Sequence, residues 1–121
     1  MQGLHLTGDL FDCRCPLERL TDMASLRDYC LKAVRKAGLT PVNELFHTFP
    51  GSAGITAVVL LAESHMAVHT WPEKMGVTLD IYVCNFGGDN SAKAHALREA
   101  MTAFFAPTKQ RLQTLQRGAA P

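Results

Sequence analysis

The segment from Leu60 to Asn85, LLAESHMAVHTWPEKMGVTLDIYVCN, constrains the fold more than any other part of the chain. Its two apolar runs predict strands at Met66–Thr70 and Val77–Cys84, joined by a turn at Trp71-Pro72. The segment also contains one serine, two histidines, two glutamates and one cysteine. Core strands do not need so many reactive side chains, so we expect these neighbouring strands to carry the functional site.

The direction of these side chains follows from the alternation of a strand. Positions of equal parity face the same way, so His65 and His69 should share one face with Glu63 and Trp71. Ser64 should face the other way unless the strand bends at that residue.

The remaining segments predict four further strands and two helices. We expect strands at 3–11, 41–49, 55–62 and 109–117, and helices at 23–37 and from 89 or 90 to 105. The nearly continuous apolar run Ile55–Ala62 predicts a central strand that is buried on both faces. The order β-α-β-β-β-β-α-β favours an α+β two-layer sandwich, a mostly antiparallel sheet with both helices on one face. Its other face would then be free for a second subunit to cover.

Length and composition indicate a single domain spanning residues 1–121. Apolar residues make up 47% of the chain and charged residues 19%, as in soluble globular proteins. The net charge of +1 gives no basic surface for nucleic acid. No apolar run approaches the roughly 20 residues that span a bilayer. The N-terminal residues do not resemble a signal peptide, so we expect a cytoplasmic protein with no membrane partner.

Four cysteines raise the question of disulfides or a metal site. A cytoplasmic location argues against disulfides. Cys13 and Cys15 form a C-x-C pair without a partner motif at zinc-finger spacing. His65 and His69 would present two ligands only on a helix, whereas their neighbours predict a strand. We therefore predict no metal site, and expect Cys30 to be a core residue of the first helix.

Three strings in the central part of the chain resemble a known family. Ala62-Glu63-Ser64-His65, His69-Thr70-Trp71-Pro72-Glu73 and Asp80-Ile81-Tyr82-Val83-Cys84 are similar to the short prokaryotic S-adenosylmethionine decarboxylase proenzymes. The resemblance extends from about residue 3 to residue 106 and is sharp from 46 to 84. It implies a pyruvoyl-dependent enzyme of spermidine synthesis, cleaved between residues 63 and 64. It also implies a homodimer whose protomers meet through their sheets, with sites at the interface.

Self-cleavage at Ser64 has a plausible chemical route. The Ser64 hydroxyl attacks the Glu63 carbonyl and converts the amide into an ester. Loss of the Ser64 α-proton then eliminates the upstream chain, and the resulting dehydroalanine hydrolyses to a pyruvoyl group and ammonia. His69 is a suitable base for that proton because imidazole titrates near neutral pH. Thr56 can donate a hydrogen bond to the developing oxyanion, where the family usually has serine.

The resemblance also assigns the decarboxylation step. The pyruvoyl ketone forms a Schiff base with the amine of S-adenosylmethionine, and CO2 departs. Cys84 matches the family's general acid, which protonates the substrate carbon. The alternative interpretation of Cys84 is a small core hydrophobe.

Four further residues correspond to the family's substrate site. Phe49, in Phe46-His47-Thr48-Phe49, would face the adenine and the sulfonium cation. Glu73 would accept hydrogen bonds from the ribose hydroxyls. Asp9 stands where the family commonly has a glutamate that serves the site. His65 either orients the cleavage loop or only packs, and we expect Trp71 to be a structural anchor.

Two other functions stay open at the level of sequence. Self-cleavage residues serve any pyruvoyl enzyme, so the same scaffold could decarboxylate ornithine or arginine. An uncleaved binding homologue is a third hypothesis, against which the combination of Ser64, His69 and Cys84 argues.

Overall fold

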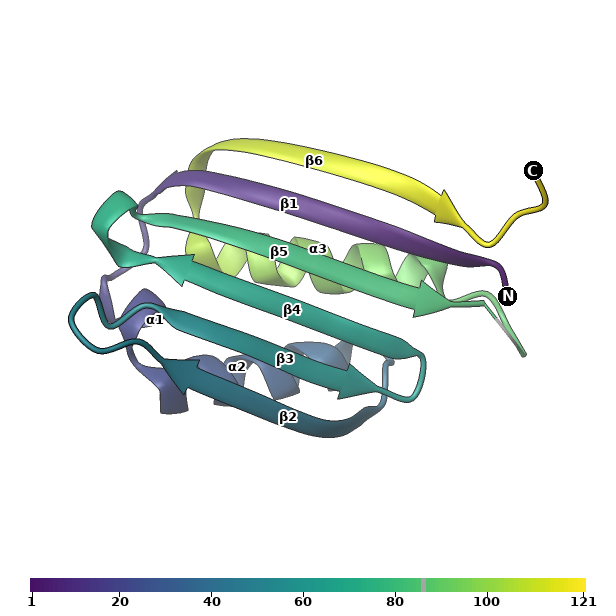
Figure 1. Ribbon diagram of the computed structural model, residues 1–121, viewed down its shortest axis with the longest axis horizontal. Coiled ribbons are helices and arrows are strands. Elements are labelled where there is room, and N and C mark those ends of the chain that lie inside the picture. Colours follow the sequence, from purple (N-terminus) through teal and green to yellow (C-terminus); the bar gives the residue numbers. More distant parts are fainter. Residues whose placement is uncertain (86) are drawn as a thin grey trace.

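A computed structural model describes residues 1–85 and 87–121. Six strands form one antiparallel sheet in the order β2-β3-β4-β5-β1-β6. The helices lie on a single face of it, α2 behind β2 and β3 and α3 behind β5 and β1 (Figure 1). The elements are β1 (Gly3–Cys13), α1 (Glu18–Thr21), α2 (Met23–Lys36), β2 (Pro41–Thr48), β3 (Ile55–Leu61), β4 (Ser64–Trp71), the 3-10 turn η1 (Pro72–Lys74), β5 (Gly76–Cys84), α3 (Ser91–Phe105) and β6 (Pro107–Arg117).

This architecture confirms the predicted α+β sandwich and the predicted order of its main elements. The short helix α1 was not predicted, because four residues are too few to produce an apolar repeat. At the start of α2 the Asp22 side chain accepts a hydrogen bond from the Ser25 N–H and so caps the helix. β6 is an edge strand beside β1, also as predicted.

The core lies between the sheet and the helices. Every second residue of the central strands points toward the helices and is buried, as in the β5 pattern of Val77, Leu79, Ile81 and Val83. The apolar faces of α2 and α3 complete this layer, including Cys30 in α2, which is fully buried as predicted. The alternate residues lie on the opposite face of the sheet, hereafter the open face, which no helix covers (Figure 1).

The expectation that residues 55–62 are buried on both faces is wrong for the single chain. Ile55, Ala57 and Val59 are buried against the helices, but Val58 and Leu60 are 39% and 49% exposed on the open face. The apolar run therefore reflects two different surroundings. One set of side chains fills the core, and the other set forms part of an exposed apolar surface.

A buried hydroxyl fixes the end of β4 that is farther from Ser64. Thr70 Oγ1 donates to the Leu20 carbonyl oxygen at 2.7 Å and accepts from the Ile55 N–H at 2.8 Å. Both hydrogen-bonding capacities of this buried side chain are used, as burial of a polar group requires. The contact ties α1 to β3 and β4 just beside Thr56 and His69.

Candidate active site

The turn between β3 and β4 holds the predicted cleavage site in a strained conformation. Leu61 pairs with Ser64, so only Ala62 and Glu63 connect the two strands. Ser64 has a φ of 153°, which residues with a side chain rarely adopt. Such a conformation persists only where the surrounding contacts enforce it, and it is typical of functional sites.

The carbonyl of the Glu63–Ser64 peptide receives a hydrogen bond from the neighbouring strand. The Cys84 backbone N–H donates to the Glu63 oxygen at 2.8 Å. This donor would stabilise negative charge on that oxygen if the Ser64 hydroxyl attacked the carbonyl carbon. The sequence predicted a side-chain donor and no sequence pattern identifies a backbone one, so only the strand pairing reveals it.

Two asparagines hold the Cys84 peptide in place. The Asn90 side-chain amide donates to the Cys84 carbonyl oxygen at 2.8 Å, and the Asn85 side-chain oxygen accepts from the Asn90 N–H at 2.9 Å. An open cavity of about 610 Å³ lies over this turn, lined by Glu63, Cys84, Asn90 and Lys93 among others. The sequence indicated no role for Asn90 at the site, so its contact with Cys84 was missed.

A second group of predicted residues lies at the other end of β4. His69 Nδ1 and Thr56 Oγ1 are 3.3 Å apart on paired positions of β4 and β3. Phe49, Trp71 and Glu73 surround them, and together these side chains line a cavity of about 390 Å³.

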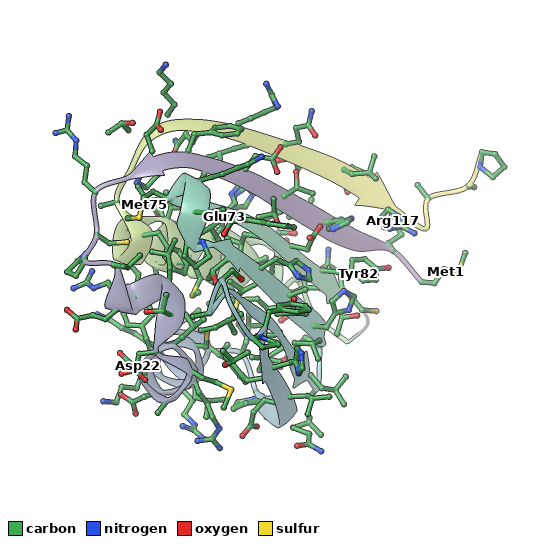
Figure 2. All side chains as sticks on the ribbon, turned by 60° about the vertical axis from the view of Figure 1, so that its left-hand side comes forward. Met1, Asp22, Glu73, Met75, Tyr82 and Arg117 are labelled. Carbon is green, nitrogen blue, oxygen red and sulfur yellow. The ribbon has the colours of Figure 1, made fainter. Side chains whose placement is uncertain are left out.

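One chain does not bring His69 to Ser64. The two residues are five positions apart on the same strand, a separation of about 17 Å at the usual rise of a strand. The strand is irregular at Ser64, where φ is 153°, so the alternation of side chains does not set the direction of the Ser64 hydroxyl. Figure 2 shows the two ends of the sheet, with Glu73 and Met75 at one end and Tyr82 and Arg117 at the other.

Comparison with known proteins identifies the family. A family model described as S-adenosylmethionine decarboxylase matches residues 4–118. The chain belongs to the S-adenosylmethionine decarboxylase family. The resemblance seen in the sequence is thereby confirmed.

Two relatives and one solved structure illustrate this relationship. The S-adenosylmethionine decarboxylase proenzyme of Parasynechococcus marenigrum (strain WH8102) is 38% identical over 96 residues, which cover 79% of this chain and 70% of the relative. The proenzyme of Synechococcus sp. (strain WH7803) is 32% identical over 127 residues, covering 97% and 94%. The crystal structure of the adenosylmethionine decarboxylase from Aquifex aeolicus VF5 matches with a TM-score of 0.86 at 32% identity, covering 98% of this chain and 92% of that chain.

Members of the S-adenosylmethionine decarboxylase family are pyruvoyl-dependent and generate the pyruvoyl group by self-cleavage. The residues of the β3–β4 turn fit the formation of that group. A serine follows a strained peptide, and a backbone N–H is already bonded to the carbonyl that the serine would attack.

Two residues predicted for the family's substrate site lie on the open face. Asp9 in β1 lies 3.7 Å from the Arg111 guanidinium in β6, and both line a cavity of about 610 Å³ that also reaches Trp71. His65 packs edge-on against Tyr82, with ring centroids 5.9 Å apart. This contact is compatible with either interpretation of His65.

Trp71 differs from its predicted role as a structural anchor. Its side chain is 47% exposed, and it borders both the cavity of Phe49 and Glu73 and the cavity of Asp9. The residue after it is a proline that begins η1, so the chain turns away and leaves the indole uncovered. A large exposed aromatic ring between two cavities is typical of a binding surface.

Burial distinguishes the other cysteines from Cys84. It raises the pKa of Cys30 to about 12 and that of Cys13 to about 11, so both stay protonated at neutral pH. Cys84 is only half-buried, beside the cleavage turn. Within residues 1–85 and 87–121 no three His, Cys, Asp or Glu side chains are grouped to hold a metal ion. The same residues include no helix that is long and apolar enough to cross a membrane.

Proposed function

We propose that this chain is a pyruvoyl-dependent S-adenosylmethionine decarboxylase that cleaves itself between Glu63 and Ser64. The observation that carries the proposal, within the family, is the strained Ser64 whose preceding carbonyl accepts the Cys84 N–H. The products are a chain of residues 1–63 and a chain of residues 64–121. The decarboxylated S-adenosylmethionine would serve spermidine synthesis in the cytoplasm.

Self-cleavage uses two groups at the turn and one base. The Ser64 Oγ adds to the Glu63 carbonyl carbon while the Cys84 N–H stabilises the charge on the carbonyl oxygen. The C–N bond breaks, an ester links Glu63 to Ser64 Oγ, and a base then removes the Ser64 α-proton so that Glu63 leaves as a carboxylate. Hydrolysis of the remaining dehydroalanine releases ammonia and leaves the pyruvoyl group.

The base comes from a second copy of the chain. His69 and Thr56 are too far from Ser64 in their own chain. When two sheets pack with their open faces together and their β4 strands antiparallel, the His69 end of each β4 lies over the Ser64 end of the other. His69 of the partner subunit then meets Ser64, and a two-fold axis produces two such sites. The open face supports this packing because it exposes apolar side chains, namely Leu45, Val58, Leu60, Trp71 and Leu115.

The same packing assembles the substrate site. Phe49 and Glu73 share a cavity with His69, so they would approach Ser64 from the partner subunit together with His69. This site, built from residues of both chains, is hereafter the composite site. The aromatic ring of Phe49 suits a sulfonium cation and an adenine, and the Glu73 carboxylate suits ribose hydroxyls. Asp9 and Trp71 border the adjoining cavity, and His65 lies next to Ser64. The pyruvoyl group supplies a ketone that accepts electrons from the substrate as CO2 leaves.

A substrate comparison tests the function. Purified, cleaved protein should release CO2 from S-adenosylmethionine and not from ornithine or arginine, because the latter two lack a ribose and a sulfonium for Glu73 and Phe49 to bind. Release from ornithine or arginine instead would contradict the substrate while preserving the pyruvoyl chemistry. An intact chain of 121 residues without activity would instead favour an uncleaved binding homologue.

Cys84→Ala should separate the two functions of this residue. Alanine keeps the backbone N–H that bonds the Glu63 carbonyl, so self-cleavage should proceed. The thiol that protonates the substrate carbon is lost, so kcat should fall by about 10²- to 10⁴-fold with little change in KM. Steady-state CO2 release by the cleaved variant measures this.

Cys15→Ala is a suitable control for Cys84→Ala. It also removes a thiol, but in the loop two residues after Cys13, which pairs with Pro107 at the end of the sheet remote from the cleavage turn. Its kcat should stay near that of the wild type. An unchanged kcat in Cys84→Ala would mean that Cys84 is only a packing residue, and failure to cleave would place its side chain in maturation.

A further inference from the structure

We propose that Thr40 is a positioning residue for self-cleavage, which anchors Glu63 so that the scissile peptide keeps its strained form. The inference rests on the proposed cleavage between Glu63 and Ser64. Thr40 does not touch the reacting atoms. It acts through the residue whose carbonyl is attacked.

Three hydrogen bonds connect Thr40 to the cleavage turn. The Ala62 N–H donates to the Thr40 carbonyl oxygen at 2.9 Å. The Thr40 N–H donates to Glu63 Oε1 at 3.0 Å, and the Thr40 hydroxyl donates to Glu63 Oε2 at 3.2 Å. Both oxygens of the Glu63 carboxylate are therefore bound by a single residue.

The anchor is itself held by local structure. Thr40 immediately precedes Pro41, which restricts the Thr40 backbone to extended conformations. Pro41 begins β2 and pairs with Leu61, the last residue before the turn. The proline and the pairing of β2 with β3 thus hold the backbone of Thr40 beside the turn.

The arrangement explains how the strain at Ser64 is maintained. A φ of 153° persists only where contacts on both sides prevent relaxation. After the scissile peptide, Ser64 is held by its pairing with Val83 on β5, and the Glu63 carbonyl is held by the Cys84 N–H. Thr40 supplies the restraint on the Glu63 side chain. Without it the turn can rotate, and the Ser64 hydroxyl loses its approach to the carbonyl carbon.

The test compares one substitution that removes the hydroxyl with one that keeps it. Thr40→Val keeps the shape of the side chain and removes the donor, whereas Thr40→Ser keeps the donor. The full-length chain is made by cell-free translation, and conversion to the 1–63 and 64–121 fragments is followed on a denaturing gel. Thr40→Val should slow conversion about fivefold, a size that the loss of one exposed hydrogen bond supports. Thr40→Ser should convert at nearly the wild-type rate.

Two further variants complete the design. Glu63→Ala removes the acceptor of both Thr40 donors and should slow conversion more than Thr40→Val, and adding Thr40→Val to it should have no further effect. Thr21→Val is the matched control, because it removes a hydroxyl that donates to the Leu17 carbonyl oxygen at α1, away from the cleavage turn. It should leave the rate unchanged.

The outcomes distinguish this proposal from the proposed function. If the wild-type chain stays intact, self-cleavage itself is refuted. If the wild type is cleaved and Thr40→Val is cleaved equally fast, the positioning role of Thr40 is refuted. Equal slowing by Thr40→Val and Thr40→Ser would also refute it, because the hydroxyl would then be irrelevant. Chains that carry Ser64→Ala stay uncleaved, so their melting temperatures can be compared with and without Thr40→Val. The two values should agree. A much lower melting temperature with Thr40→Val would assign Thr40 to folding instead.

Discussion

Ser64→Ala should yield an intact chain that has no decarboxylase activity at all. Alanine has no hydroxyl to attack the Glu63 carbonyl, so neither the ester nor the pyruvoyl group can form. The strained turn and the Cys84 N–H remain in this variant, but they have no nucleophile to assist. Intact-mass measurement should give a single species of 121 residues, whereas the wild type should give fragments 1–63 and 64–121.

The control for Ser64→Ala is Ser25→Ala. Ser25 is an exposed serine in the first turn of α2, on the helix side of the sheet, so its replacement should leave cleavage and CO2 release unchanged. A wild-type sample that stays at full length after prolonged warm incubation would contradict the assignment of Ser64. A Ser64→Ala sample that is cleaved between residues 63 and 64 would do the same.

The second large effect concerns the composite site. His69→Ala alone should stop after ester formation, because no base removes the Ser64 α-proton. Hydroxylamine, which cleaves esters and spares amides, should then split this variant after Glu63. Co-expression of His69→Ala with Ser64→Ala should restore self-cleavage, although neither variant is cleaved alone.

This rescue follows from the separation of about 17 Å between the two residues in one chain. In a mixed dimer one site combines Ser64 of the His69→Ala chain with His69 of the Ser64→Ala chain, and it is complete. The other site lacks both groups. With random pairing, about half of the His69→Ala chains should be cleaved, and no Ser64→Ala chain should be.

The control for this experiment uses a doubly substituted partner. A chain with both Ser64→Ala and His69→Ala should form dimers with the His69→Ala chain, as differently tagged copies can demonstrate, but should not restore cleavage. Mixed dimers of the two single variants that remain uncleaved would refute the composite site. If the His69→Ala chain alone is cleaved at the wild-type rate, His69 is not the base.

The sequence by itself determined the fold class and the chemical type of the site. Alternating apolar residues predicted the strands, and apolar residues at helical spacing predicted α2. These signals are local, because side-chain direction along a strand or helix follows from the geometry of the backbone.

The sequence misjudged the surroundings of β3. An apolar run does not reveal whether its second face is buried within the same chain or exposed for another subunit, because both require the same side chains. Only the strand order, with the helices on a single face, decided that Val58 and Leu60 lie on the open face.

Tertiary structure alone decided which groups meet at the cleavage turn. The Cys84 N–H bonds Glu63 across 21 residues of sequence, and the Thr40 donors reach the same residue across 23. A backbone N–H carries no sequence signal, and an isolated threonine carries almost none. Which of them contacts the scissile peptide depends on the register of β2, β3, β4 and β5 and on the length of one turn. The packing of the whole sheet against its helices sets that register, because a slip of one residue would move buried side chains to the open face.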